Sequence, residues 1–378
     1  MKIISLIFLI IISSLALCQE YKSGLKREDF QTVIDGKKTD LYVLTNENGY
    51  EISICNYGGH IAAIMAPDKD GNFQNVVQGY DSIDNLVNSP NEYLSTLIGR
   101  YGNRIRNGSF SLDDKEYQLG CNEGNITHLH GGYKGFHKQV WDAEQKNDQE
   151  LKLTYVSKDG EENYPGTLTV EVTFSLNNDN EFKLSYRANT FKKTIINLTH
   201  HMFVNLIGLS SDPCPLILDH ILQVNANWYL PTDNLQVPTG EIESVNSTPF
   251  DFRKPRRVGD ALDCTDNPDI ILGKGIDHNF VLNRKREGEM IFAGKVVDPT
   301  TKRSMEVYTS EPGMQVYTAN YHDGFKGYHN ITMPYRSAFA FETQHFPDSP
   351  SISHFPSVVL NPENTYISDT IYKFGIEE

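Results

Sequence analysis

The chain has 378 residues, of which 39% are hydrophobic and 11% aromatic, and it carries a formal net charge of -15. Such an acidic surface repels phosphate backbones, so the composition argues against nucleic acid as a partner. The length exceeds that of an ordinary domain, but all-β domains often reach this size, so a single large domain is compatible with it.

The first residues predict a secretory signal peptide. One lysine precedes an apolar run, and Ala16 and Cys18 stand where signal peptidase requires small residues. The run is short for a membrane span, which needs about 20 apolar residues. We therefore expect removal of residues 1–18, secretion to the extracellular space and no membrane contact after cleavage. Residues 19–378 are expected to form one domain.

Export would permit both disulfides and N-linked glycans. The cysteines that remain after cleavage lack zinc-like spacing, and the sequence does not choose among their pairings; they are Cys55, Cys121, Cys214 and Cys264. Asn-x-Ser/Thr sequons, which fit a secreted glycoprotein, occur at Asn107, Asn125, Asn197, Asn246 and Asn330.

Three segments predict β-hairpins. Residues 41–59 contain the turn pair Asn48-Gly49, and residues 67–77 contain Asp70-Gly71. In residues 167–190 apolar and polar residues alternate on both sides of an Asn-Asn-Asp-Asn turn. Many short strands without intervening helices predict an all-β fold, a large antiparallel β-sandwich.

Two histidines lie close together in "THLHGG". If this segment is a strand, His128 and His130 share a face and could hold a metal. A metal site needs a third ligand, however, and the Gly pair also suits a bend where a ligand approaches the backbone. The metal site therefore stays the weaker of two interpretations.

Other polar residues interrupt strand-like sequence. In "NLTHHMFVNL" the adjacent His200 and His201 must point to opposite sides, so at most one faces a shared pocket. In "GNRIRNG" Arg104 and Arg106 would share a side; one is a candidate surface charge, and the one beside Asn103 is placed to bind hydroxyls.

Three more polar residues stand in or after apolar strands. Asp277 in "IDHNF" and Gln315 in "PGMQVYT" are side chains that sugar hydroxyls would require. In "AFAFETQHFPDSP" Glu342 ends an apolar run, where burying a carboxylate is costly unless the group is paired or used. No Gly-x-Ser-x-Gly, phosphate loop or His-Glu-x-x-His occurs, which argues against serine hydrolases, nucleotide enzymes and zincin proteases.

Taken in order, these clusters resemble the aldose 1-epimerase family, also called galactose mutarotases. The likeness runs through "GRYGNRI", "LHGGYKGFHKQVW", "NLTHHMFVNL", "TPFDFR", "GIDHNFVL", "PGMQVYTANY" and "FETQHFPDSP". It implies a β-sandwich of the supersandwich type with an open sugar cleft. It also implies interconversion of the α and β anomers of free aldoses such as galactose and glucose, without metal or organic cofactor.

The resemblance also implies residue roles. Glu342 matches the family's general base, and His201 matches its general acid. The positions that match substrate-binding residues are Asn103, Arg104, His130, Asp277 and Gln315. A strand near the cleft would also leave the sequon at Asn197 unmodified.

This chain departs from the family pattern at four places. His200 stands where the family usually has Asn, Gly102 where it has Ala, and His137 where it has Asp. Near the end, "NPENTY" replaces the usual Pro-Gly-Glu. The change before His201 could alter how that imidazole is oriented.

Three other functions remain alternatives. One is a secreted carbohydrate-binding protein on the same fold that has lost turnover. Another is a glycoside hydrolase using Glu342 with Asp277, which needs two carboxyls about 5 to 9.5 Å apart. The last is an epimerase of phosphorylated hexoses, which the net acidity of the chain disfavours.

Overall fold

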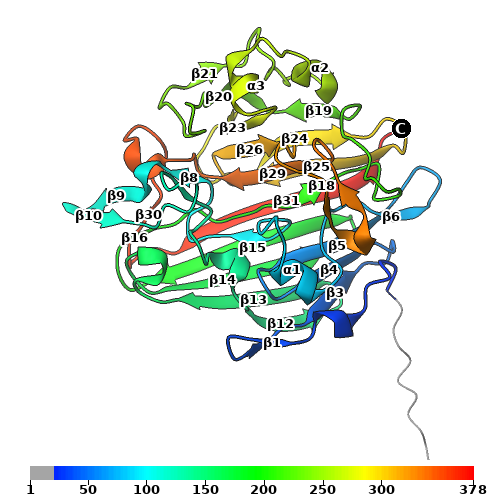
Figure 1. The fold of residues 1–378 in the computed structure, drawn as a ribbon, viewed down its shortest axis with the longest axis horizontal. Helices are drawn as coiled ribbons and strands as arrows, with labels where there is room; N and C mark the ends of the chain where they lie inside the picture. Colours follow the sequence, from blue (N-terminus) through cyan, green and yellow to red (C-terminus); the bar gives the residue numbers. More distant parts are fainter. Residues whose placement is uncertain (1–20) are drawn as a thin grey trace, which may run out of the picture.

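The computed structural model describes residues 21–378, so the predicted signal peptide, residues 1–18, lies outside the described part. Strands dominate, every strand pairing between named strands is antiparallel, and the α-helices of the described part have five residues each. Within these residues no helix has the length and apolar character needed to cross a bilayer. The predicted all-β fold is confirmed, with sheets that run across the whole molecule (Figure 1).

A nine-stranded antiparallel sheet forms the broad base of the molecule. In spatial order its strands are β12 (Asp142–Asn147), β13 (Glu150–Ser157), β14 (Leu168–Leu176), β15 (Glu181–Thr190), β31 (Tyr366–Ile376), β25 (Arg303–Thr309), β24 (Ile291–Val297), β19 (Ile221–Val224) and β22 (Arg256–Arg257). The hairpin predicted in residues 167–190 is β14 and β15. Their buried and partly exposed residues alternate strictly, as expected for a sheet with one face on a core.

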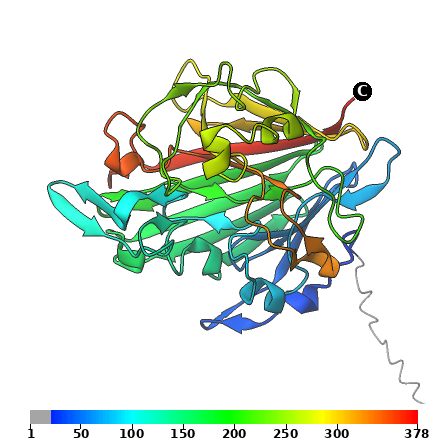
Figure 2. The ribbon, with the colours of Figure 1, turned by 45° about the horizontal axis from the view of Figure 1, so that its top comes forward.

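A six-stranded antiparallel sheet lies over part of this base. Its order is β18 (Phe203–Val204), β29 (Phe339–Gln344), β26 (Gly313–Tyr317), β23 (Asp277–Leu282), β20 (Ala226–Tyr229) and β21 (Glu243–Ser244). All six residues of β29 are buried, so this strand is covered on both faces. Both views show the yellow segments on one side of β31 and the blue N-terminal hairpins on the other (Figures 1 and 2).

The N-terminal hairpins form a four-stranded sheet. It consists of β3 (Leu41–Thr45), β4 (Glu51–Cys55), β5 (His60–Pro67) and β6 (Phe73–Asn75) in sequence order. The β3–β4 pair is the hairpin predicted in residues 41–59, and the β5–β6 turn contains Asp70-Gly71 as expected.

Short elements complete the fold. The two-stranded pairs are β1 (Val33–Ile34) with β2 (Lys37–Lys38), β7 (Leu97–Ile98) with β17 (Thr199–His200), β8 (Arg104–Ile105) with β11 (His128–Leu129), β9 (Ser109–Leu112) with β10 (Lys115–Gln118), β16 (Thr194–Ile195) with β30 (Val359–Leu360), and β27 (Phe325–Lys326) with β28 (Thr332–Met333). The α-helices are α1 (Ile83–Val87), α2 (Val258–Leu262) and α3 (Pro268–Leu272). The 3-10 turns are η1 (Arg27–Phe30), η2 (Arg106–Gly108), η3 (Phe136–Lys138), η4 (Glu161–Asn163), η5 (Tyr328–Asn330) and η6 (Ser349–Ser351).

The main hydrophobic core joins the nine- and six-stranded sheets. Phe339 and Phe341 of β29 belong to the same buried cluster as Leu184 of β15 and Tyr372 of β31. Burying one such side chain contributes about 1.5–3 kcal/mol. Because side chains alternate along a strand, Glu342 must point away from this core, to the outer face of the six-stranded sheet.

Candidate functional site

A cleft of about 370 Å³ opens on that outer face. Six of the seven predicted site residues line it, namely Asn103, Arg104, His130, His201, Asp277 and Glu342. The seventh, Gln315, pairs with Glu342 in the β26–β29 register and donates a hydrogen bond from Nε2 to Asp277 Oδ1 at 2.7 Å. The structure therefore brings all seven together.

Glu342 is buried at the floor of the cleft. It is 2% exposed, and in the described part of the chain its Oε2 has no hydrogen-bond partner. Burial raises the pKa of this carboxyl well above its usual value, the nearby charge of Asp277 adds to the increase, and Arg104 partly opposes it. A carboxyl whose pKa is raised well above its usual value holds a proton more readily, which suits general acid–base chemistry.

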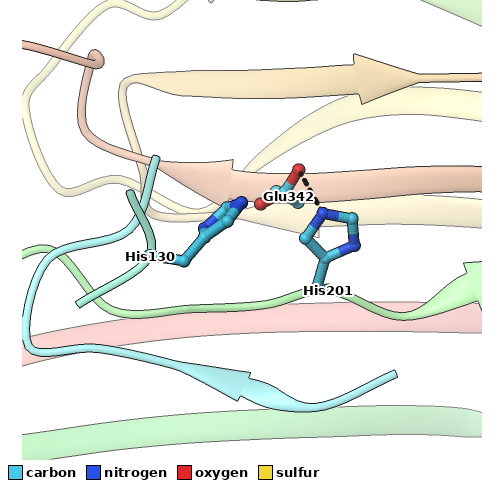
Figure 3. A group of neighbouring side chains, drawn as sticks. All are labelled: His130, His201 and Glu342. Atoms are coloured by element: carbon cyan, nitrogen blue, oxygen red, sulfur yellow. Dashed lines mark ion pairs between the residues drawn. The ribbon is translucent and has the colours of Figure 1, made fainter. Parts of the chain in front are cut away.

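His201 contacts this carboxyl directly. It lies between β17 and β18, and its Nε2 is 3.4 Å from Glu342 Oε1 (Figure 3). Burial lowers the pKa of His201 to about 4. As predicted, His200 points the other way, with its Nε2 3.1 Å from the Gly59 carbonyl and its ring against Phe174.

The protonation of Glu342 and His201 is coupled. The raised pKa of the carboxyl and the lowered pKa of the imidazole both favour the uncharged form of each group when no ligand is bound. The 3.4 Å contact then joins a protonated carboxyl and a neutral imidazole. Together the two groups hold one titratable proton, which can lie on either of them. Moving that proton to the imidazole creates a base and an acid side by side.

His130 approaches Glu342 from the other side, so the two rings flank the carboxyl group (Figure 3). Strand β11 ends at Leu129, and His130 adopts a left-handed backbone with φ of 50°. The expectation that His128 and His130 share a face is therefore wrong. His128 turns away to Tyr164 Oη and the Gly120 carbonyl, because the chain leaves the extended conformation between the two residues.

His130, His201 and Glu342 offer three possible metal-ligand atoms within 4.8 Å of one another. However, Nδ1 of His130 accepts a hydrogen bond from the Asn103 backbone N–H at 3.2 Å. A neutral imidazole has one nitrogen lone pair, so the other nitrogen, Nε2, carries its proton and acts as a donor. Burial also lowers the pKa of His130 well below its usual value. This hydrogen bonding favours a donor to a ligand oxygen over a metal ligand.

Arg104 forms one wall of the cleft. Its Nε and Nη2 bind both carboxylate oxygens of Glu123 at 2.7 and 2.6 Å, and Nη2 also donates to Gln236 Oε1 at 2.9 Å. Arg106 does not share this side, because the strand gives way to a 3-10 turn there and the side chain binds Asp233 at 2.7 Å. Glu123 thus holds the Arg104 guanidinium in a fixed orientation.

Asp277, the first residue of β23, lines the same cleft as Arg104. Burial raises the pKa of the Asp277 carboxyl, while Arg104 and the hydrogen bond from Gln315 oppose the increase. The amide oxygen of Gln315 is buried without a partner among the described residues. The set therefore offers acceptors and donors for the hydroxyls of a polar ligand.

Several cleft residues were absent from the sequence prediction. Tyr317 pairs with Asp277 in the β23–β26 register and accepts a hydrogen bond from the Tyr321 backbone N–H at 2.9 Å. Its spacing of two from Gln315 was a usable signal, since alternate strand residues share a face. Glu123, Tyr93 and His322 also line the cleft. They lie in loops, and no sequence pattern marked them.

The remaining expectations concern residues outside the cleft. All four cysteines are free in the described chain, so no disulfide joins them. His345, three residues after Glu342 in the chain, binds Glu311 at 2.6 Å. Asn197 is 0% exposed, and its Nδ2 donates to the Gly102 carbonyl at 3.2 Å. The other sequon asparagines are exposed: Asn107, Asn125, Asn246 and Asn330.

Three of the four departures from the family pattern have identifiable surroundings in this structure. A Cβ on Gly102 would lie 3.1 Å from Thr199 Cγ2, tight enough that the neighbour would have to shift slightly. His200 anchors the segment before His201 through its bond to the Gly59 carbonyl. His137 is buried with both ring nitrogens unpaired in the described part, and burial lowers its pKa to about 3.

The comparisons with known proteins agree with this geometry. The family model for aldose 1-epimerase matches residues 40–373. The chain is 39% identical to galactose mutarotase from Bos taurus over 86% of this chain and 91% of that protein. It is 32% identical to aldose 1-epimerase from Escherichia coli K12, over 91% of this chain and 97% of that protein.

Solved structures show the same fold. Galactose 1-epimerase from Lactobacillus acidophilus superposes with a TM-score of 0.79 at 28% identity, covering 92% of this chain and 97% of that one. An aldose epimerase homologue from C. elegans superposes with a TM-score of 0.81 at 24% identity, covering 90% and 100%. The chain therefore belongs to the aldose 1-epimerase family.

Proposed function

We propose that this protein is an aldose 1-epimerase that interconverts the α and β anomers of free aldoses such as galactose and glucose. The observation that carries the proposal is the buried contact of 3.4 Å between Glu342 and His201 at the floor of the cleft. Anomer exchange needs one base and one acid acting on the same acetal centre, which this pair supplies.

The reaction needs no proton beyond the one that Glu342 and His201 already share. With the shared proton on His201, the Glu342 carboxylate accepts the proton of the C1 hydroxyl while His201 donates one to the ring oxygen O5. The C1–O5 bond breaks, and the pair returns to the neutral state that its pKa shifts favour. After rotation about C1–C2, the reverse transfers close the ring on the other aldehyde face. Each positioned group contributes roughly 10²- to 10⁴-fold.

The other cleft residues orient the sugar. Arg104 and the Nε2–H of His130 donate hydrogen bonds, and Asp277, braced by Gln315 at 2.7 Å, accepts them. Asn103 fixes the His130 tautomer through its backbone N–H. Rigid orientation of this kind keeps C1 and O5 within reach of the two proton-transfer groups.

The charges of the cleft disfavour phosphorylated hexoses. Arg104 is the single Lys or Arg among the described lining residues, and Glu123 already neutralises it. The carboxyl groups that line the same cleft are those of Glu92, Glu123, Asp277, Asp323 and Glu342, of which Glu342 is protonated in the resting state. The net negative charge of the cleft would repel a phosphate dianion, whereas it would not repel a neutral aldose.

A polarimetric assay tests the activity. Purified protein should accelerate the optical-rotation decay of fresh α-D-galactose and α-D-glucose above the buffer rate. An authentic mutarotase serves as the positive control. Saturable galactose binding without acceleration would instead support the carbohydrate-binding alternative, and release of reducing sugar from galactosides would support the hydrolase.

We also propose that the protein is exported and N-glycosylated. The pattern of residues 1–18 and the four exposed sequons support this. Expression in eukaryotic cells should place the protein in the medium with its N terminus at residue 19. Peptide mapping should find glycans at exposed sequons and none at Asn197, which is buried. Retention of an unprocessed chain inside the cells would contradict the export proposal.

A further inference from the structure

The cleft has a second end, which is aromatic. Beyond His201 it is lined by Phe203, His322 and Phe325, and we refer to these three residues as the aromatic end. The rings form a continuous series: His201 and Phe203 have centroids 4.7 Å apart, Phe203 and His322 4.9 Å, and His322 and Phe325 5.0 Å. Arg104 and Asp277 line the same cleft and supply its polar, charged groups.

His322 is an unpaired polar group within this apolar surrounding. It is 5% exposed, and neither ring nitrogen has a hydrogen-bond partner among residues 21–378. A buried polar group without a partner is destabilising, so the imidazole would gain from a ligand hydroxyl. Burial, helped by His201, lowers the pKa of His322 to about 3, so the neutral ring offers one donor and one acceptor.

The proposed chemistry orients the sugar relative to this end. Glu342 serves the C1 hydroxyl and His201 serves O5, so the sugar atoms beyond O5 lie farther along the same direction, past His201. In a hexopyranose those atoms are C5 and its exocyclic CH₂OH group. The methylene carbon suits the faces of Phe203 and Phe325, and the hydroxyl suits an imidazole.

Resting on the proposed function, we propose that His322 binds the C6 hydroxyl of an aldohexose and so determines selectivity for hexoses that carry this group. Both ring nitrogens of His322 are buried in the structure. The torsion about the Cβ–Cγ bond of histidine is soft, so a turn of the ring presents a nitrogen to the cleft when the hydroxyl arrives.

The test compares D-galactose with 6-deoxy-D-galactose, which lacks only this hydroxyl. Dissociation constants are measured by titration calorimetry, and kcat/KM by polarimetry, for the intact protein. The wild type should favour D-galactose roughly tenfold in both measurements, as one hydrogen bond to a buried group implies. In H322L this ratio should fall towards one, and in H322Q, which keeps a donor and an acceptor, it should be partly restored.

A matched control separates selectivity from folding. His220 is a second buried histidine, packed against Phe339 in the core and absent from the cleft lining. H220L should lower the melting temperature but keep the wild-type ratio between the two sugars. A ratio that is the same in the wild type and in H322L would overturn the role of His322.

The calorimetric readout keeps the two proposals distinguishable. A wild type that binds D-galactose selectively and loses this selectivity in H322L, but accelerates no anomer exchange, would refute the epimerase function and support the role of His322. A wild type that turns over both sugars with equal kcat/KM and binds them equally would refute only the role of His322. A wild type that binds neither sugar would refute both.

Discussion

The nine-stranded and six-stranded sheets use buried residues in different ways. Along β14 of the nine-stranded sheet, the buried residues from Leu168 to Leu176 are all apolar and alternate with partly exposed ones. In β29 of the six-stranded sheet all residues are buried, and Glu342, Thr343 and Gln344 are polar. The first pattern maximises apolar burial, which stabilises the fold. The second places a titratable group, Glu342, in the cleft, where burial raises its pKa, and this suits catalysis rather than stability.

The largest expected effect comes from replacing the carboxyl of the six-stranded sheet. E342Q keeps the shape of the side chain but cannot accept a proton, so turnover should fall roughly 10²- to 10⁴-fold. Stability should not decrease, because the substitution removes a buried ionisable group. Polarimetric rates and thermal melts of the same samples check both parts. Near wild-type turnover in E342Q would move the base role to another residue.

A core substitution in the nine-stranded sheet should lower stability and leave turnover nearly unchanged. Leu184 of β15 is fully buried in the main core. L184A should lower the free energy of unfolding by about 2–5 kcal/mol, through lost burial and the cavity left behind. At a temperature where the variant stays folded, its kcat/KM should remain within about twofold of wild type. Urea unfolding followed by tryptophan fluorescence, together with polarimetry, provides the measurement; a large loss of kcat/KM would show that the two sheets are not functionally separate.

The pH dependence of activity should reveal the shared proton of Glu342 and His201. Activity requires one proton on the pair, so kcat/KM should fall about tenfold per unit below pH 4, where His201 also becomes protonated. At the alkaline side it should fall when the pair loses its proton, at a pH well above the usual carboxyl pKa. Rates from pH 3.5 upwards test this. An acid limb near the ordinary imidazole pKa of about 6.5 would contradict the coupling.

The smallest effect concerns Asp277. D277N keeps one acceptor oxygen but removes the charge that binds a sugar hydroxyl, so KM should rise roughly tenfold while kcat changes less. Initial rates over a range of galactose concentrations separate the two constants. A loss of kcat comparable to that of E342Q would instead place Asp277 in proton transfer.

Local signals explain which parts of the fold could be predicted from the sequence. The β14–β15 hairpin follows from strict alternation and an Asn-rich turn, both of which act over neighbouring residues. The opposite directions of His200 and His201 follow from the same alternation. Alternation did not predict the direction of His130, because its left-handed backbone depends on contacts with Asn103, which is distant in the sequence.

The candidate site depended more on resemblance than on pattern. From the residues alone, Glu342 was a carboxylate in a costly position, and its pairing with His201 joins residues 141 positions apart in the chain. Glu123 and His322 reach the cleft from loops whose paths depend on the whole fold. Such convergence has no local sequence signature, so only tertiary structure could reveal these residues.

The most direct test of the central claim is anomeric exchange observed at equilibrium. Two-dimensional NMR exchange spectroscopy of galactose, recorded with wild type, E342Q and H201N at equal concentration, follows the α and β H1 signals directly. Strong exchange cross-peaks with the wild type and only the buffer rate with both variants is the predicted result. Equal cross-peaks in all three samples would contradict the assignment of the reaction to Glu342 and His201.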